Sequence, residues 1–340
     1  MSVAQIDAPV DTSGDDVFLG AYLAPFRPFL DRPGVSEILI NRPGEVWIEE
    51  AGSTGMVRVD APLVDDRLLR RLAEQVARMT SQGISREQPL LAATLPDGAR
   101  LQFVAPPATR AGWALAIRRH SLADVPLSAW STDAIGVPPV ACDPVLRVDA
   151  PLAWLTEQVR SRRTVLISGG TSSGKTTFLN ALLREIDPAE RVVVVEDTPE
   201  VRIPAPNSLG LVAVSGELGE ARVDTDDLLR ASLRLRPDRI VLGELRGREA
   251  VTFLRAINTG HPGSLSTIHA NSCAGALEQL ALMVMQADLG LSRADTIAYA
   301  LTLIDVVVQL GRRDGQRHIL DIREARELER DLGIDQARTP

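Results

Sequence analysis

The sequence predicts an α/β protein in which a smaller α+β domain precedes a larger domain with a mostly parallel sheet. Three observations support this class. The chain has 340 residues, and single cores usually stop growing beyond about 250 to 300 residues. After residue 145, apolar strands alternate with helices, whereas the first 120 residues mix short strands with one clear helix. Between these parts, residues 121–144 contain four prolines and no sustained periodicity, which is typical of a linker.

The first part of the chain predicts an α+β domain over residues 1–120. Residues 45–50 and 112–120 favour strands, and residues 65–80 carry an apolar stripe at helical spacing. Residues 90–106 predict a hairpin, because two apolar-rich runs flank Pro96, Asp97 and Gly98, which form a strong turn signal. We expect a linker over residues 121–145 and the second domain over residues 146–340.

Residues 146–340 predict a parallel sheet with helices on both faces. The apolar, β-branched segments alternate with helical segments, which is the pattern of buried parallel strands and their crossovers. The expected strands cover residues 164–168, 191–197, 239–245 and 264–269, and the expected helices cover residues 175–186, 224–235, 248–258 and 274–286. Residues 323–333 are charged and favour a solvated helix.

Composition excludes several classes of protein. The net charge of -8 and the pI near 5.2 do not supply the broad positive field on which non-specific nucleic-acid binding depends. Cys142 and Cys273 lie far apart, which argues against a zinc module and a disulfide framework. The first residues lack the parts of a signal peptide, and no apolar run approaches the ~20 residues that span a bilayer. We therefore expect a cytoplasmic protein with peripheral membrane contact at most.

A phosphate-binding loop is the strongest motif of the chain. Residues 169–176, GGTSSGKT, match G-x-x-x-x-G-K-[ST] between a predicted strand and a predicted helix, which is the context that this loop requires. Backbone N–H groups would face the phosphates, Lys175 would neutralise the terminal phosphates, and Thr176 would hold Mg²⁺. The nucleotide contacts predicted from this motif are Gly169, Gly170, Thr171, Ser172, Ser173, Gly174, Lys175, Thr176 and Thr177.

Acidic residues and a histidine follow other strands of the predicted sheet. Glu196 and Asp197 end one apolar strand, Glu244 ends another, and His269 follows a third. A single carboxylate in such a place is ordinarily a helix N-cap or part of a surface ion pair. Because ligands of open parallel sheets bind outside the carboxyl ends of the strands, we expect these groups to share one crevice with the loop. His261 precedes its strand and would lie at the other end.

These motifs resemble the secretion-superfamily traffic ATPases that drive type II secretion, type IV pili and type IV secretion. GGTSSGKTT is similar to their Walker A motif, VVVEDTPEV to their Asp box, DRIVLGELRG to their glutamate-ended Walker B motif, and GHPGSLSTIHANS to their His box, in the family's order. ILINRPGEVWIEE and LPDGARLQF resemble the N-terminal domain of the type IV secretion branch. The resemblance covers most of the chain and implies a RecA-like P-loop NTPase domain after the N-terminal domain.

The resemblance also implies roles for the residues that follow the strands. In this family ATP binds between the N- and C-terminal domains of a homo-hexameric ring, and hydrolysis drives domain movement. By motif matching, Glu196 and Glu244 take the acidic roles around the attacking water and Mg²⁺. Glu196 is favoured as the general base, although the sequence leaves open which glutamate has that role, and Glu244 lies on the metal side. His269 contacts the γ-phosphate.

Three further nucleotide contacts rest on the resemblance. Arg100 and Arg118 match arginines by which the family's N-terminal domain caps the nucleotide, and His261 shares the His box. An isolated strand arginine is ordinarily part of a surface ion pair. The N-terminal domain would also help to form the ring, and the expected partners are other secretion-system ATPases and inner-membrane components.

Two departures from related branches favour type IV secretion of the conjugation or effector-delivery kind. Two distant cysteines cannot build the tetracysteine zinc element that type II secretion and pilus-assembly members often carry. The chain also lacks the long N-terminal extension common in the tight-adherence branch. We expect an ATP-driven motor at the cytoplasmic base of a type IV secretion system, where it powers pilus biogenesis, substrate translocation or both. A tight-adherence or type IV pilus assembly ATPase is the alternative within the family.

Other classes of protein share the P-loop. A nucleic-acid translocase on a RecA-like core is disfavoured by the charge of -8 and the aromatic content of 4%, because single-strand binders combine basic grooves with stacking rings. A small-molecule kinase needs an acceptor, whereas a motor releases phosphate from ATP in water. A non-hydrolysing switch has no need for the clustered acids.

Overall fold

The structure is a computed structural model that describes residues 14–50, 53, 55–95, 97–119, 144–215, 222–313 and 316–334. The chain divides into two compact units, Met1–Ala105 with Gly112–His120, and Pro106–Ala111 with Ser121–Pro340. The short segment Pro106–Ala111 thus belongs to the second unit, although it lies within the first domain of the sequence prediction. The predicted linker, residues 121–145, lies outside the described residues as far as residue 143.

The first unit contains a six-stranded antiparallel sheet with the strand order β3-β2-β1-β6-β5-β4. The predicted strands and hairpin are confirmed as β2, β6 and the β4–β5 pair. The strands are β1 (Val35–Ile40), β2 (Gly44–Glu50), β3 (Val57–Ala61), β4 (Leu90–Thr94), β5 (Arg100–Val104) and β6 (Ala114–Arg118).

One long helix packs against this sheet. In α3, the N-cap residue Asp65 accepts a hydrogen bond from the N–H of Leu68 at 2.7 Å, which is the preferred way to begin a helix. The apolar stripe of α3 is buried in a core shared with strand residues such as Ile38 and Phe103. The helices of this unit are α1 (Gly14–Leu23), η1 (Ala24–Phe26), α2 (Arg27–Leu30) and α3 (Asp66–Met79).

The second unit contains a seven-stranded sheet with the order β15-β14-β7-β13-β12-β8-β9. Every neighbouring pair is parallel except β14 and β15, which confirms the predicted mostly parallel sheet. The strands are β7 (Val165–Gly169), β8 (Val192–Glu196), β9 (Ser208–Val212), β12 (Arg239–Leu245), β13 (Leu265–Ile268), β14 (Val306–Arg313) and β15 (Gln316–Glu324). A separate pair, β10 (Val214–Ser215) and β11 (Arg222–Val223), is antiparallel.

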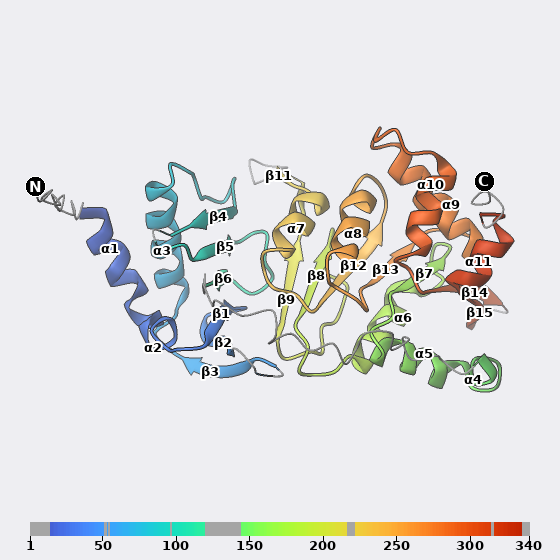
Figure 1. Ribbon diagram of the computed structural model, residues 1–340, viewed down its shortest axis with the longest axis horizontal. Helices are drawn as coiled ribbons and strands as arrows, with labels where there is room; N and C mark the ends of the chain where they lie inside the picture. Colours follow the sequence, from blue (N-terminus) through green and yellow to red (C-terminus); the bar gives the residue numbers. More distant parts are fainter. Residues whose placement is uncertain are drawn as a thin grey trace, which may run out of the picture. The chain divides into compact units, whose positions relative to one another are not determined.

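Helices cover both faces of the larger sheet. On one face, Trp154 of α5 and Leu179 of α6 share a core with strand residues such as Ile167. Since adjacent side chains of a strand point to opposite faces, the buried Leu166 belongs to the other face. There α7 and α8 lie side by side and contact β8 and β12 (Figure 1). The helices are α4 (Pro144–Asp149), α5 (Pro151–Arg160), α6 (Lys175–Leu182), η3 (Leu183–Glu185), α7 (Thr225–Ser232), α8 (Glu249–Asn258), α9 (Cys273–Met285), α10 (Arg293–Leu301) and α11 (Ala325–Asp331).

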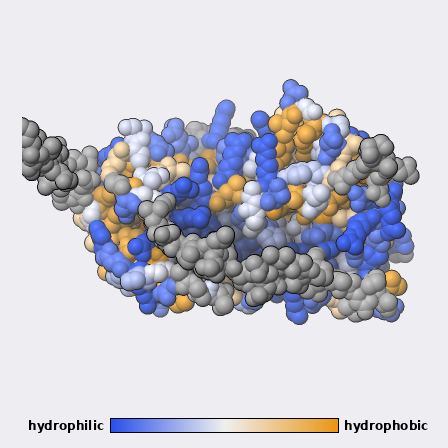
Figure 2. All heavy atoms as spheres, viewed as in Figure 1, coloured by the Kyte–Doolittle hydropathy of each residue, from blue (hydrophilic) through white to orange (hydrophobic). Residues whose placement is uncertain are grey.

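Some large apolar side chains are exposed at the surface. Within the described part of the chain, no helix is both long enough and apolar enough to span a membrane. Figure 2 shows a group of apolar side chains at the surface near the ends of α9 and α10, where Leu282, Met285, Leu289 and Leu291 are 43% to 49% exposed.

Candidate active site

The phosphate-binding loop joins β7 to α6 at the carboxyl edge of the seven-stranded sheet. Gly174, at the start of α6, has a φ of +94°, a left-handed conformation that glycine adopts without steric cost. No side chain caps α6, so the backbone N–H groups of its first turn keep hydrogen-bonding capacity that an anion would satisfy. The nine residues expected to contact the nucleotide, 169–177, therefore run from the end of β7 through the loop into the first turn of α6.

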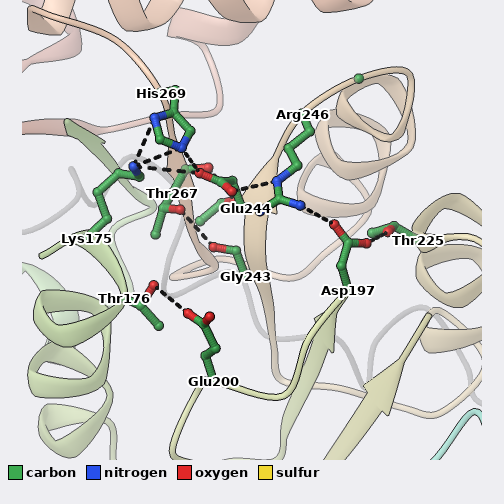
Figure 3. A network of polar contacts seen from close by, with 12 residues as sticks. Lys175, Thr176, Asp197, Glu200, Thr225, Gly243, Glu244, Arg246, Thr267 and His269 are labelled. Atoms are coloured by element: carbon green, nitrogen blue, oxygen red, sulfur yellow. Dashed lines mark hydrogen bonds and ion pairs between the residues drawn. The ribbon is translucent and has the colours of Figure 1, made fainter. Parts of the chain in front are cut away.

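Lys175, Glu244 and His269 meet beside this loop (Figure 3). His269 Nε2 lies 2.7 Å from Glu244 Oε1, and Lys175 Nζ lies 3.6 Å from the same oxygen. Lys175 Nζ is also 3.3 Å from each ring nitrogen of His269, and it donates to the carbonyl oxygen of Gly169 at 3.0 Å. Burial lowers the pKa of Lys175, and the Glu244 carboxylate opposes this shift. Three segments that are distant in the sequence thus converge on one point.

Arg246 holds the other side of the Glu244 carboxylate. Its Nε donates to Glu244 Oε2 at 2.6 Å, and its guanidinium donates to Asp197 at 3.1 Å. Asp197 in turn accepts a hydrogen bond from the Thr225 hydroxyl at 2.7 Å (Figure 3). The hydrogen bond to Glu244 raises the pKa of Arg246. Both oxygens of Glu244 therefore face cationic or hydrogen-bonding groups, which fixes the orientation of this carboxylate at the end of β12.

A cavity of about 80 Å³ lies where β8 and β12 end beside α6. The Thr176 hydroxyl donates to Glu200 Oε2 at 3.4 Å, and Mg²⁺ prefers hydroxyl and carboxylate oxygens of this kind. No group of three or more His, Cys, Asp or Glu side chains among the described residues could hold a metal ion. This donor set fits a Mg²⁺ ion that takes most of its ligands from substrate phosphates and water. The residues lining the cavity are Thr176, Glu196, Asp197, Thr198, Glu200, Gly243, Glu244, Arg246 and Thr267.

Glu196 also lines this cavity, but its carboxylate is buried and firmly held. One oxygen accepts hydrogen bonds from the N–H groups of Glu200 and Val201, at 3.0 and 2.7 Å. The other oxygen forms an ion pair with Arg110, whose guanidinium also donates to the carbonyl of Val201 at 2.8 Å. Burial lowers the pKa of Arg110. If Glu196 acts as the general base, the oxygen that pairs with Arg110 has to accept the proton from water, either while the ion pair is kept or after it is broken.

The remaining predicted nucleotide contacts lie elsewhere. His261 precedes β13 at the amino edge of the sheet, where its Nδ1 is 3.0 Å from the carbonyl oxygen of Ala256. It is therefore not brought to the loop within this unit. Arg100 and Arg118 belong to the first unit, where they are direct cross-strand partners on β5 and β6. Arg118 pairs with Glu37 at 3.5 Å, and the nucleotide contacts of both arginines stay a prediction.

Several groups at the site were not singled out from the sequence. Arg246 lies two residues after Glu244, and Glu200 lies four residues after Glu196, so both fall inside the quoted motifs. Their motif positions could have identified them as candidates. Arg110 has no such signal, because only the fold brings it to Glu196 across 86 residues of sequence.

Comparisons with known proteins agree with this geometry. The family model described as "Type II/IV secretion system protein" matches residues 21–339. The chain is 40% identical to the "Type IV secretion system protein PtlH homolog" of Bordetella bronchiseptica, over 88% of this chain and 93% of the relative. It is 34% identical to the "Type IV secretion system protein VirB11" of Bartonella quintana, over 88% of this chain and 91% of the relative. The crystal structure of the VirB11 ATPase from the Brucella suis type IV secretion system, in complex with sulphate, superposes with a TM-score of 0.85 at 31% identity, covering 94% of this chain and 98% of that chain.

Proposed function

Because the chain belongs to the type II/IV secretion system protein family, we propose that it is an ATP-hydrolysing motor of a type IV secretion system. The relatives named as type IV secretion proteins, and the similarity to a secretion ATPase of known structure, support this role. The observation that carries the proposal is the meeting of Lys175, Glu244 and His269 at the phosphate-binding loop. A strand-end carboxylate beside a P-loop lysine is the arrangement that P-loop ATPases require.

Binding of the triphosphate uses groups that are now engaged with the protein. Lys175 exchanges its hydrogen bond to the Gly169 carbonyl for contacts to the terminal phosphates. The uncapped N–H groups of α6 donate to phosphate oxygens. His269, which now lies against Lys175 and Glu244, is placed to donate a hydrogen bond to the γ-phosphate.

Hydrolysis requires a positioned water and stabilisation of the charge that develops on the phosphates. Thr176 and Glu244 would hold Mg²⁺, with Glu244 giving up part of its present contacts, and the ion would supply electrostatic stabilisation of the phosphate oxygens. Glu196 is the candidate general base, since its carboxylate lines the cavity and is aimed by two backbone N–H groups. Arg246 keeps the Glu244 carboxylate oriented throughout.

The assembly that we propose is a homo-hexameric ring at the cytoplasmic side of the inner membrane, in contact with other secretion ATPases and membrane components. Its work is pilus biogenesis, substrate translocation or both. For Arg100 and Arg118 we propose a nucleotide contact from the first unit, and their positions as direct cross-strand partners on β5 and β6 support a joint contact. Sizing with and without ATP tests the ring.

Steady-state phosphate release from ATP tests the central proposal. Lys175→Ala, Glu196→Ala, Glu244→Gln and His269→Ala are compared with the wild type and with Glu278→Gln. Glu278 is a carboxylate on α9 that pairs with Arg293 and does not line the cavity. We expect the four site variants to lose activity by about 10²-fold or more and the control to keep it. Wild-type rates in both Glu196→Ala and Glu244→Gln would exclude the assigned acidic roles.

The single lysine of the sequence provides an independent test of nucleotide binding. Lys175 is the only lysine among the 340 residues, so an amine-acylating reagent modifies this side chain and the N-terminal amine alone. Burial lowers the pKa of Lys175, and its reaction should therefore begin at a lower pH than that of a solvent-exposed lysine. We expect ADP to protect Lys175 in peptide mapping. Equal acylation with and without nucleotide would count against binding at this loop.

Stimulation by single-stranded DNA would instead favour a nucleic-acid translocase. For that class, DNA binding falls steeply with salt and ATP hydrolysis rises when DNA is added. We expect neither behaviour from a chain with a net charge of -8.

A further inference from the structure

The side chain of Arg317 lies across the last glycine of the phosphate-binding loop. A Cβ atom placed on Gly174 would be 2.7 Å from Arg317 Cδ, 2.9 Å from its Nε and 3.5 Å from its Cζ. Any residue other than glycine would therefore collide with this arginine. Arg317 belongs to β15, 143 residues after Gly174 in the sequence, and no motif of the chain includes it.

The register of the β14–β15 hairpin explains how Arg317 reaches the loop. β14 runs parallel to β7, and Leu310 pairs with Gly169, the last residue of β7. Leu310 and its cross-strand partner Ile319 pack in the core that α6 covers. Because side chains two residues apart share a face, Arg312 and Arg317, which are also cross-strand partners, continue this face beyond the core. Arg317 thus arrives at the N-terminus of α6.

A guanidinium is an unfavourable neighbour for this helix end unless an anion is present. The N-terminus of a helix carries partial positive charge, and Lys175 adds a full charge next to Gly174. Within the part of the chain that the structure describes, Arg317 forms no ion pair that would neutralise it. The protein as a whole is acidic, with a net charge of -8. A polyanion bound at this point would interact favourably with all of these positive groups.

The order of the strands indicates which end of the nucleotide Arg317 faces. Glu244 and His269 follow β12 and β13, which lie on one side of β7, whereas β14 and β15 lie on its other side. The proposed γ-phosphate and metal groups are therefore on the β13 side of the loop. A phosphate chain that crosses the loop leaves its α-phosphate on the β14 side.

We propose that Arg317 binds the α-phosphate of the nucleotide in the same subunit. This assignment rests on the proposed function, because it requires ATP at the loop. The α-phosphate undergoes no change in the hydrolysis of the γ-phosphate, so its contacts are equally strong in the ground state and the transition state. Uniform binding of this kind affects KM and leaves kcat unchanged.

The experiment compares Arg317→Ala, Arg317→Lys and Arg313→Ala with the wild type. Arg313 is the matched control, because it lies on the same hairpin next to Arg312 and its side chain projects from the opposite face. For Arg317→Ala we expect KM for ATP and Kd for ADP to rise by the same factor, about tenfold for a charge-assisted hydrogen bond, with kcat within about twofold. Arg317→Lys keeps the charge but loses the planar set of N–H donors of the guanidinium, so KM and Kd should rise by about threefold.

Three results would overturn the assignment. Arg317→Ala and Arg313→Ala with the same KM would show that Arg317 has no special contact. A loss confined to ATP and accompanied by a fall in kcat would place Arg317 at the γ-phosphate. A lower thermal midpoint for Arg317→Ala, with KM restored at lower temperature, would indicate a structural role. If the wild type hydrolyses ATP and Arg317→Ala behaves like Arg313→Ala, only the role of Arg317 is refuted. If the wild type binds no nucleotide, the proposed function is refuted as well.

Discussion

The two edges of the seven-stranded sheet treat charged side chains in opposite ways. At the amino edge, Arg239 opens β12 and is fully buried. Its Nε and one terminal nitrogen donate to the two oxygens of Glu190, at 2.8 and 2.7 Å. The other terminal nitrogen donates to the carbonyls of Val159 and Gly263, at 2.7 and 3.2 Å. Each of the three nitrogens of this guanidinium therefore donates at least one hydrogen bond within the protein.

The carboxyl edge has the same kinds of residue in a different arrangement. Glu244 is 15% exposed and His269 is 48% exposed, and they share hydrogen-bonding partners with Lys175 beside a small cavity. Lys175 donates to the backbone of its own loop, an arrangement that a phosphate can replace. The difference shows that charge burial alone does not identify a binding site. The useful distinction is whether the hydrogen bonds of the charged groups are completed by the fold or are open to exchange.

Lys175→Met gives the largest change expected at the carboxyl edge. In the proposed mechanism the lysine contacts the phosphates that carry the developing charge, so we expect phosphate release from ATP to fall by about 10³-fold or more. Stability should not fall. Burial lowers the pKa of Lys175, so the unfolded chain binds this proton more tightly than the folded protein does. The buried cation therefore costs stability once the pH falls below the unfolded-state pKa, and its removal should keep or raise the thermal midpoint.

The matching measurement is a thermal melt of the Lys175→Met protein beside its activity assay. A large fall in the midpoint would mean that Lys175 belongs with the closed networks of the amino edge. The comparison between the two edges would then fail at its most important residue.

Arg239→Met is the corresponding change at the amino edge. It leaves the Glu190 carboxylate buried with only a peripheral cation, and breaking a buried pair in this way costs about 3–5 kcal/mol. We expect a loss of this size in urea unfolding of the second unit. Restoring the balance with Arg239→Met and Glu190→Met together should recover part of the loss. If the double variant were less stable than Arg239→Met alone, the other contacts of the Glu190 carboxylate would contribute more to stability than its pairing with Arg239.

The sequence predicted the parts of this fold that depend on local pattern. The strands and helices around the loop, and the convergence of Glu244 and His269 on Lys175, follow from apolar runs, motif spacing and the rule that strand ends share an edge. His261 lies at the opposite edge because it precedes its strand, so strand direction was a better guide to its place than membership of the His box.

The rest of the site depends on packing between distant segments. Arg110 reaches Glu196 from the Pro106–Ala111 segment, and Arg317 reaches the loop from β15, which pairs with a strand that the local pattern did not predict. Neither position carries a motif, because the order of strands in the sheet and the register of the β14–β15 hairpin are tertiary properties. Such contacts become visible only when the strands are in their places.

Arg246→Ala should give a smaller change at the carboxyl edge. The variant frees one oxygen of Glu244 and one of Asp197 without removing a group that contacts phosphate. We expect kcat to fall by about tenfold, the usual range for losing an orienting hydrogen bond, with the thermal midpoint unchanged because Arg246 is 62% exposed. Arg246→Lys should recover little, since one ammonium cannot span both carboxylates. Activity equal to that of the wild type would mean that Lys175 and His269 suffice to orient Glu244.

Arg162→Gln should give the smallest effect. It tests most directly whether stability at the amino edge depends on the completed hydrogen bonds of Arg239. Arg162 contacts Glu190, the same carboxylate that Arg239 holds, at 3.0 Å, but it is 45% exposed. Water screens an exposed ion pair, so we expect a loss of at most about 1 kcal/mol in urea unfolding, against the several kcal/mol expected for Arg239. Glutamine keeps an unbranched polar side chain without the charge, and it leaves the left-handed backbone at this residue, φ 56°, no more strained than before. If Arg162→Gln destabilised the protein as much as Arg239→Met does, the stability of this edge would depend on net charge around Glu190 rather than on the completed hydrogen bonds of Arg239.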